Sequence, residues 1–153
     1  MIETRSYHPG DLTACLALFD SNVPQFFAPD ERAQFVEFLE NVPASDGTYL
    51  VLAQAGRVMA CGGVAREPDT ESAALTWGMV DRSQHRQGLG TRLTQARLTA
   101  AWAMPGIRRV ILATSQHTAG FYRGFGFTLQ ATIPDGFAPG LDRCDMVLER
   151  DQI

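Results

Sequence analysis

Residues 2–7 alternate between apolar and polar side chains, which predicts a first β-strand. After this strand the apolar residues recur every three or four positions. Asp11 is the expected N-cap of a first helix, and a second helical pattern runs from Pro29 to the residue before Pro43. The beginning of the chain is therefore expected to form one strand and two helices.

Three strand-like runs follow, at residues 48–54, 57–65 and 73–80. An Ala-Gly pair joins the first two, and a polar turn that contains a proline joins the second to the third. The three runs are expected to form an antiparallel meander.

A helical pattern over residues 91–104 comes next and is ended by a Pro-Gly pair, after which residues 108–115 form a short apolar run. A strand, a helix and a strand of these lengths predict a parallel strand pair with a right-handed crossover. The inward face of the helix is expected to be apolar and to carry Leu89, Leu93, Ala96, Ala100 and Ala103.

The last part of the chain is expected to hold a short helix within residues 116–127. Two strands, at residues 127–133 and 143–149, then flank a loop at residues 134–142. The element order predicts an α+β fold with a mixed sheet. The 153 residues are enough for one domain, spanning residues 1–153.

Charge and composition exclude several functions. All 13 basic residues are arginine, so a P-loop lysine, a Schiff-base lysine and a lysine general base are absent from the sequence. The net charge of -4 argues against a nucleic-acid partner. No apolar run approaches the roughly 18 residues of a membrane span, and the first residues lack a signal-peptide pattern. We therefore expect a cytoplasmic protein with no membrane partner.

The sequence contains three cysteines and three histidines without the spacing of a metal site. No metal is expected. Cys15, Cys61 and Cys144 are expected to be buried thiols in a reducing compartment.

The segment HRQGLGTRL, residues 85–93, lies between an expected strand and an expected helix and contains Gly88 and Gly90. A dinucleotide-binding fingerprint needs a third glycine where Leu93 stands, and a P-loop needs a lysine. The unpaired N–H groups at a helix N-terminus suit phosphate oxygens, and glycines allow a pyrophosphate to approach. From this segment alone, a phosphate site and a simple strand-to-helix turn are both possible.

The segment HRQGLG resembles the signature of the GNAT superfamily of N-acetyltransferases, Gln/Arg-x-x-Gly-x-Gly/Ala, with His85 in place of the first residue. About thirty residues later, AGFYRGFGF is similar to a second segment of that family, A-x-x-F-Y-x-x-x-G-F. The resemblance spans most of the chain. It implies a GNAT-like, mostly antiparallel sheet of about six or seven strands, helices on both faces, and a splayed parallel strand pair at the cofactor site.

The resemblance implies acetyl-CoA as the co-substrate, with its pantetheine arm between the strands at residues 73–80 and 108–115. It places the pyrophosphate on backbone amides of the glycine loop. Ser115 stands where an asparagine often touches the pantetheine arm, although Ser115 is equally suited to cap a helix starting at Gln116. The implied cofactor-binding residues are Met79, Val80, Arg86, Gln87, Gly88, Leu89, Gly90, Thr91 and Ser115.

In this family a free primary amine attacks the thioester directly, and a tetrahedral intermediate expels the CoA thiolate. By resemblance, the Val80 N–H would stabilise the oxyanion and Tyr122 would be the general acid. An aromatic core role for Tyr122 is the alternative.

A general base is not identified, because Ala74 stands where some relatives have a glutamate. The candidates are Glu71, Asp81, His117, Asp142 and a water chain. The acceptor, a small-molecule or peptide amine, is expected near the loops at residues 20–31 and 134–143. Residues there that suit an apolar pocket with an anionic end are Phe26, Phe27, Phe137, Asp135 and Asp142.

Two other functions remain open at this point. A CoA-binding sensor or partner-binding protein of the same fold would lack turnover, and a nucleotide-phosphate binder would use the same loop. A homodimer is possible, since dimers are common for this fold.

Overall fold

The computed structural model describes residues 1–45 and 47–150. These residues form a seven-stranded mixed sheet with four α-helices, which confirms the expected α+β fold. The strands are β1 (Ile2–Ser6), β2 (Thr48–Gln54), β3 (Arg57–Arg66), β4 (Ser72–Val80), β5 (Arg109–Thr114), β6 (Thr128–Ala138) and β7 (Leu141–Glu149). The helices are α1 (Leu12–Ser21), α2 (Arg32–Asn41), α3 (Leu89–Ala103) and α4 (Ala119–Arg123).

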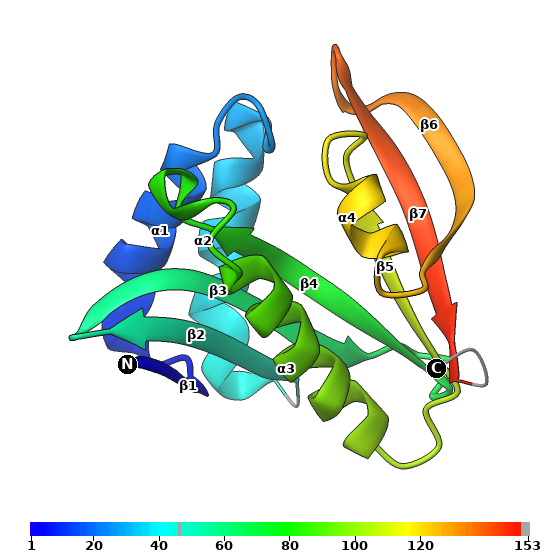
Figure 1. The fold of residues 1–153 in the computed structure, drawn as a ribbon, viewed down its shortest axis with the longest axis horizontal. Coiled ribbons are helices and arrows are strands. Elements are labelled where there is room, and N and C mark those ends of the chain that lie inside the picture. Colours follow the sequence, from blue (N-terminus) through cyan, green and yellow to red (C-terminus); the bar gives the residue numbers. More distant parts are fainter. Residues whose placement is uncertain (46, 151–153) are drawn as a thin grey trace.

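The strand order is β1-β2-β3-β4-β5-β7-β6, and every neighbouring pair is antiparallel except β4 and β5. The meander and the parallel pair expected from the sequence are therefore confirmed. Figure 1 shows β4 and β5 close together at one end and far apart at the other. The carboxyl ends of the two strands are therefore not paired with each other.

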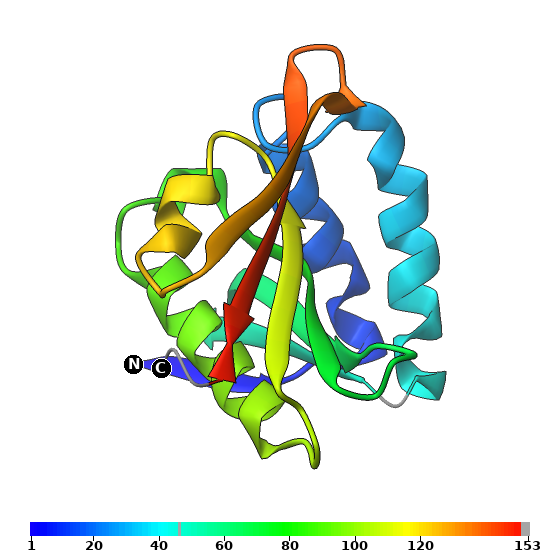
Figure 2. The same cartoon turned by 90° about the vertical axis from the view of Figure 1, so that its right-hand side faces the viewer.

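The helices cover both faces of the sheet, as Figure 2 shows edge-on: α1 and α2 pack on one face, and α3 and α4 lie on the other. The core beneath α1 and α2 includes Phe19, Phe35 and Val51. On the other face, the core beneath α3 and α4 includes Leu93 and Val110. Each layer therefore buries apolar side chains against one face of the sheet.

The three cysteines are free and buried, as expected from the sequence. Burial among apolar side chains makes a thiol a small hydrophobic residue. Within the described residues, no helix is long and apolar enough to cross a lipid bilayer.

Asp11 is the N-cap residue of α1, as expected, but its side chain makes no capping hydrogen bond to that helix. A 3₁₀ turn at Pro9–Asp11 precedes the helix, and the Asp11 carboxylate accepts the His8 N–H of that turn instead. The same carboxylate accepts two hydrogen bonds from the Arg5 guanidinium, at 2.8 and 2.9 Å. Asp11 therefore ties β1 to the start of α1.

The inward face of α3 also differs from the expectation. Leu89 and Leu93 are buried, but Ala103 is exposed, and Ala96 and Ala100 are only partly buried. The next buried positions along the helix are instead Thr94, Arg97 and Ala101. Arg97 was not among the residues expected on this face, yet it is 2% exposed.

The C-terminal hairpin is longer than expected, because most of the segment assigned to a loop is strand. The register of β6 against β7 is irregular between Ile133 and Ala138, and pairing resumes at Ala138 with Leu141. Proline, glycine and aspartate in residues 134–142 predicted a loop, but these residues form a bulged strand and a tight turn. The short helix likewise begins at Ala119 and not at Gln116.

Candidate active site

The site lies where β4 and β5 separate. The two strands pair only from Ser72 to Ala74 on β4 and from Arg109 to Ile111 on β5. Beyond these residues, the ends of both strands line a single groove with a volume of about 880 Å³. Unpaired strand ends expose backbone groups, so the groove offers hydrogen-bonding positions as well as apolar walls.

A bulge in β4 marks the point where the strand leaves its partner. The register against β3 shifts between Cys61 and Gly63, and Trp77 on β4 has a left-handed backbone with φ of 41°. The Trp77 carbonyl accepts a hydrogen bond from the Tyr49 hydroxyl at 2.8 Å. The Trp77 ring packs among the phenylalanines of the α1 and α2 layer, which stabilises the unusual backbone.

The glycine loop connects β4 to α3 and has two left-handed residues, Arg86 with φ of 68° and Gly88 with φ of 83°. Gly88 is the N-cap of α3, and the first helical bond runs from the Arg92 N–H to the Gly88 carbonyl. The N–H groups of the first turn therefore have no acceptor within the helix. A β-carbon on Gly88 would meet no atom within 4 Å, so conformation and ligand access, not crowding, favour glycine here.

Val80, at the end of β4, directs its backbone into the groove. The Asp81 N–H donates to the Met59 carbonyl of β3 at 2.9 Å, so the adjacent Val80 carries its N–H and carbonyl on the opposite edge of the strand. The carbonyl accepts the Asn22 side-chain amide at 2.9 Å and lies 3.0 Å from the His85 Nε2. These contacts fix the backbone orientation at Val80.

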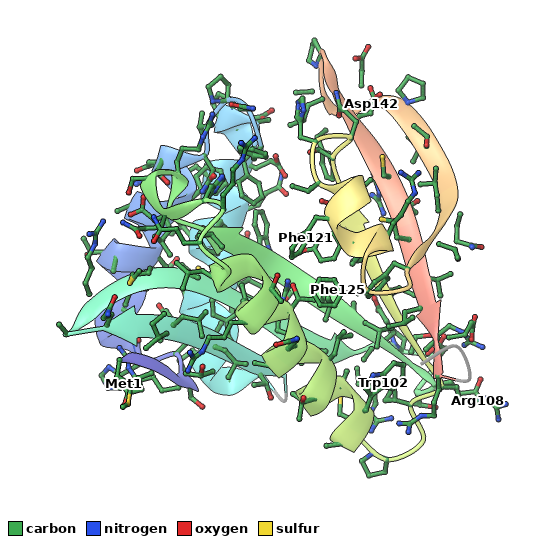
Figure 3. All side chains as sticks on the ribbon, in the orientation of Figure 1. Met1, Trp102, Arg108, Phe121, Phe125 and Asp142 are labelled. Atoms are coloured by element: carbon green, nitrogen blue, oxygen red, sulfur yellow. The ribbon has the colours of Figure 1, made fainter. Side chains whose placement is uncertain are left out.

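Tyr122 lies on α4 and lines the same groove. Its ring packs edge-on against Phe121 and Phe127, with centroids 5.1 and 5.8 Å away. Its hydroxyl accepts a hydrogen bond from the Arg97 guanidinium at 3.2 Å. Figure 3 shows Phe121 on the side of α4 that faces the other half of the sheet. Tyr122 thus has a packed ring and a polar end at the groove.

Aromatic side chains and one half-buried carboxylate also line the groove. Phe26, Phe27 and Phe137 line it, as the sequence predicted. Glu31, which the sequence reasoning missed, lines it as well and accepts the Ala28 N–H at 2.8 Å. Burial raises the pKa of Glu31 above its ordinary value. Glu31 follows Pro29 at the third position of a 3₁₀ turn, and this capping pattern is the signal that was available in the sequence.

Two acidic residues expected near the acceptor belong to a turn instead. The Asp142 carboxylate accepts the Asp135 N–H at 3.0 Å, and the Asp135 carboxylate accepts the Gly140 N–H at 2.7 Å. Neither lines the groove, and Figure 3 shows Asp142 near the far end of the β6 and β7 hairpin. Aspartate oxygens bind nearby backbone N–H groups readily, and this local preference prevailed.

Of the candidate bases, only His117 lines the groove; Glu71 and Asp81 lie outside it, as Asp142 does. Asp81 caps a 3₁₀ turn at Arg82–Gln84 and pairs with Arg57 at 3.2 Å. Although burial opposes the shift, hydrogen bonds from Ser83 and Arg57 lower the pKa of Asp81. A stabilised carboxylate of this kind is a poor proton acceptor.

Most of the remaining predicted site residues do meet in the groove. Ser115 is 4% exposed, and its hydroxyl accepts the His117 N–H at 3.2 Å, which favours a turn-stabilising role. Gln87 lies outside the groove, and Leu89 buries its side chain in the core under α3. The predicted residues that line the groove are Met79, Val80, Arg86, Gly88, Gly90, Thr91, Ser115 and Tyr122.

Comparisons with known proteins agree with this architecture. A GNAT-family protein from Desulfovibrio desulfuricans is 21% identical, with a TM-score of 0.80 and coverage of 97% of this chain and 99% of its own. Salmonella typhimurium yncA, solved with its cofactor acetyl-CoA, is 17% identical, with a TM-score of 0.79 and coverage of 100% and 96%. A GCN5-related N-acetyltransferase from Kribbella flavida is 19% identical, with a TM-score of 0.80 and coverage of 97% of each chain. At these identities the likeness concerns the fold. A search of curated protein sequences finds no significant match.

A sheet whose parallel strands splay beside a glycine loop has the architecture of the GNAT fold. The model of the acetyltransferase (GNAT) family matches residues 15–127, which include both the glycine loop and the segment around Tyr122. The chain belongs to the GNAT family.

Proposed function

We propose that this protein is an N-acetyltransferase that moves the acetyl group of acetyl-CoA to a primary amine. The observation that carries this proposal is the meeting of the glycine loop, the Val80 backbone and the Tyr122 hydroxyl in one groove. These groups come from three separate segments of the chain. Their convergence supplies an anion site, an oxyanion donor and a proton donor for one reaction.

The glycine loop fits the pyrophosphate of acetyl-CoA. The left-handed backbone at Arg86 and Gly88 and the unpaired N–H groups of the first turn of α3 form a concave array of donors. The β-carbon position of Gly88 meets no atom within 4 Å, so the loop leaves room at the helix start, whereas that of Gly90 already lies 3.4 Å from the Phe121 ring. The space between β4 and β5 then receives the pantetheine arm, which brings the thioester to the reacting amine.

The Val80 N–H supplies the oxyanion donor in this proposal. Its strand edge faces the groove, and two side chains hold the carbonyl of the same residue. A donor fixed before the reaction stabilises the developing negative charge on the thioester oxygen without reorganising, an effect often worth about 3–4 kcal/mol.

Tyr122 acts as the general acid for the leaving sulfur. Its hydroxyl lies in the groove on α4, across from β4. A positioned proton donor contributes about 10²–10⁴-fold in rate. The His85 and Ser115 differences from the family pattern leave this arrangement intact, because His85 binds the Val80 carbonyl and Ser115 caps a turn.

The acceptor is an amine that binds beside the aromatic residues lining the groove. Phe26 and Phe137 provide apolar contact, and Glu31 is the acidic residue among the described groove-lining side chains. A carboxylate among aromatic rings suits a positively charged amine with an apolar part.

An amine panel tests the proposed function. Amino acids, polyamines, aminoglycosides and N-terminal peptides are incubated with acetyl-CoA, and thiol release is measured. Release that depends on one amine class supports an acetyltransferase and identifies the acceptor. CoA binding without release for any class would instead indicate a non-catalytic CoA-binding protein.

A further inference from the structure

Arg97 is the most unusual charged residue of the described chain. It is 2% exposed, although it lies on the middle of α3, and its Nε has no hydrogen-bond partner. Within residues 1–45 and 47–150, no carboxylate lies within ion-pair distance of its guanidinium. A buried, unpaired charge is costly to a fold, so its presence needs a reason other than stability.

Two glycines leave the space that the Arg97 side chain occupies. A β-carbon on Gly78 would lie 2.6 Å from Arg97 Nη1, and one on Gly62 would lie 3.3 Å from its Cδ. Gly78 directly follows the left-handed Trp77, so the β4 bulge helps to form this space. The strands therefore leave space for Arg97 to reach across the sheet side of α3 toward α4.

The hydrogen bond to Tyr122 has only one possible direction. A guanidinium donates hydrogen bonds and accepts none, so the Tyr122 oxygen must be the acceptor in the 3.2 Å contact with Arg97 Nη2. The phenol hydrogen is consequently free for a different acceptor. Since both residues line the groove, that hydrogen is available to a ligand atom there.

We propose that Arg97 is a positioning residue that holds Tyr122 as a proton donor and stabilises the phenolate left after proton transfer. This inference rests on the proposed acetyl transfer.

As the carbon–sulfur bond breaks, the sulfur keeps the bonding electron pair and takes the Tyr122 proton. The negative charge then resides on the phenolate, next to the Arg97 cation. The phenolate regains a proton from solvent, which receives the proton released by the attacking nitrogen, so the cycle balances.

The proposed role in catalysis predicts that a substitution at Arg97 lowers kcat. The cost of burying its charge predicts that the same substitution does not lower the thermal midpoint. In Arg97→Met, the apolar stem is retained and the unpaired charge is removed, so the thermal midpoint should equal or exceed that of the wild type. A residue kept only for structure would lower the midpoint when changed.

A double-mutant cycle tests the coupling. Turnover is measured for the wild type, Arg97→Met, Tyr122→Phe and the double variant, with Arg97→Lys for partial rescue and exposed Arg92→Met on the same helix as control. We expect Arg97→Met to lower kcat by about 10–100-fold with little change in the KM for acetyl-CoA, and to have no further effect when Tyr122 is phenylalanine. Equal losses in both backgrounds, or an unchanged kcat, would overturn the proposal.

Calorimetry with CoA over the same four proteins provides a readout without turnover. Tyr122→Phe should weaken CoA binding severalfold when Arg97 is present and leave it unchanged in Arg97→Met, because only Arg97 directs the hydroxyl to the sulfur. A wild type that is inactive on every amine but shows this coupling would refute acetyl transfer and support the positioning role. Additive effects on binding in an inactive protein would refute both, as would the absence of CoA binding.

Discussion

Asn22 and Val80 connect the end of α1 to the end of β4. The Asn22 side-chain amide donates to the Leu18 carbonyl at 2.8 Å and to the Val80 carbonyl at 2.9 Å, and Asn22 is 2% exposed. Both N–H groups of the amide are thus used. Because Val80 is the proposed oxyanion donor, this one side chain links the helical layer to the chemistry of the groove.

Asn22→Leu should therefore impair both stability and catalysis. Loss of these hydrogen bonds should destabilise the protein by about 1–3 kcal/mol, and a less firmly held Val80 should lower kcat. Asn41→Leu is a matched control, since exposed Asn41 makes the same local bond to the Glu37 carbonyl. Denaturant unfolding and steady-state kinetics measure the two effects. Equal behaviour of the two variants would show that the bond to Val80 contributes nothing.

Gly78→Ala should separate folding from catalysis. The added methyl group would meet the movable end of the Arg97 side chain, so the fold should persist while the guanidinium is displaced and kcat falls. Gly63→Ala is the contrast, because its methyl group would lie 2.6 Å from the fixed Thr48 carbonyl and should destabilise the protein. Thermal unfolding and kcat are compared for the two. A Gly78→Ala protein with full kcat would contradict the placement of Arg97.

Glu31→Gln should weaken binding of a cationic acceptor by about tenfold, close to 1.4 kcal/mol, while kcat changes little. Burial raises the pKa of Glu31, so its carboxylate becomes fully anionic at a higher pH than that of an ordinary glutamate. The KM for the acceptor should fall as pH rises through that pKa in the wild type and stay flat in the variant. Glu40→Gln, at an exposed position on α2, is the control. Identical pH profiles for the wild type and Glu31→Gln would exclude this residue from acceptor binding.

The Arg5 and Asp11 pair should make stability dependent on acid. Hydrogen bonds from Arg5 lower the pKa of Asp11 in the folded protein below its value in the unfolded chain. The stabilisation is therefore present above the unfolded pKa, about 3.9, and is lost as pH falls through the folded value. Asp11→Asn should destabilise the protein by about 1–2 kcal/mol at neutral pH and flatten the acid dependence of its stability.

The exposed Asp20 and Arg32 pair is the comparison, and Asp20→Asn should change stability by less than about 1 kcal/mol. A steep acid dependence in Asp11→Asn would assign the effect to other carboxylates.

The parts of the site that the sequence predicted are those encoded by the backbone and by local motifs. Gly88 has the left-handed backbone that glycine adopts most easily at such a helix start. Val80 was predicted because it ends the strand that precedes the loop. Tyr122 belongs to a short segment with a fixed pattern. Such features require no knowledge of distant contacts.

The missed parts depend on packing between distant segments. Arg97 stands four residues after Leu93 and four before Ala101, so its place on the buried stripe was visible in the spacing. Arginine is rarely fully buried, and the apolar face expected from the sequence did not include Arg97. Only the glycines opposite it on β3 and β4 make its burial possible. Asp135 and Asp142 were expected near the acceptor, but both carboxylates accept backbone N–H groups of a turn that is close in sequence.

Calorimetric titration of the protein with acetyl-CoA and CoA tests the central claim most directly. Asparagine and aspartate both tolerate the left-handed backbone of Gly88, so Gly88→Asn and Gly88→Asp form a pair that differs by one charge. We predict that the wild type binds both ligands well below millimolar concentration, that Gly88→Asn retains measurable binding, and that Gly88→Asp loses it through repulsion of the pyrophosphate. A wild type that takes up neither ligand at millimolar concentration would contradict the account.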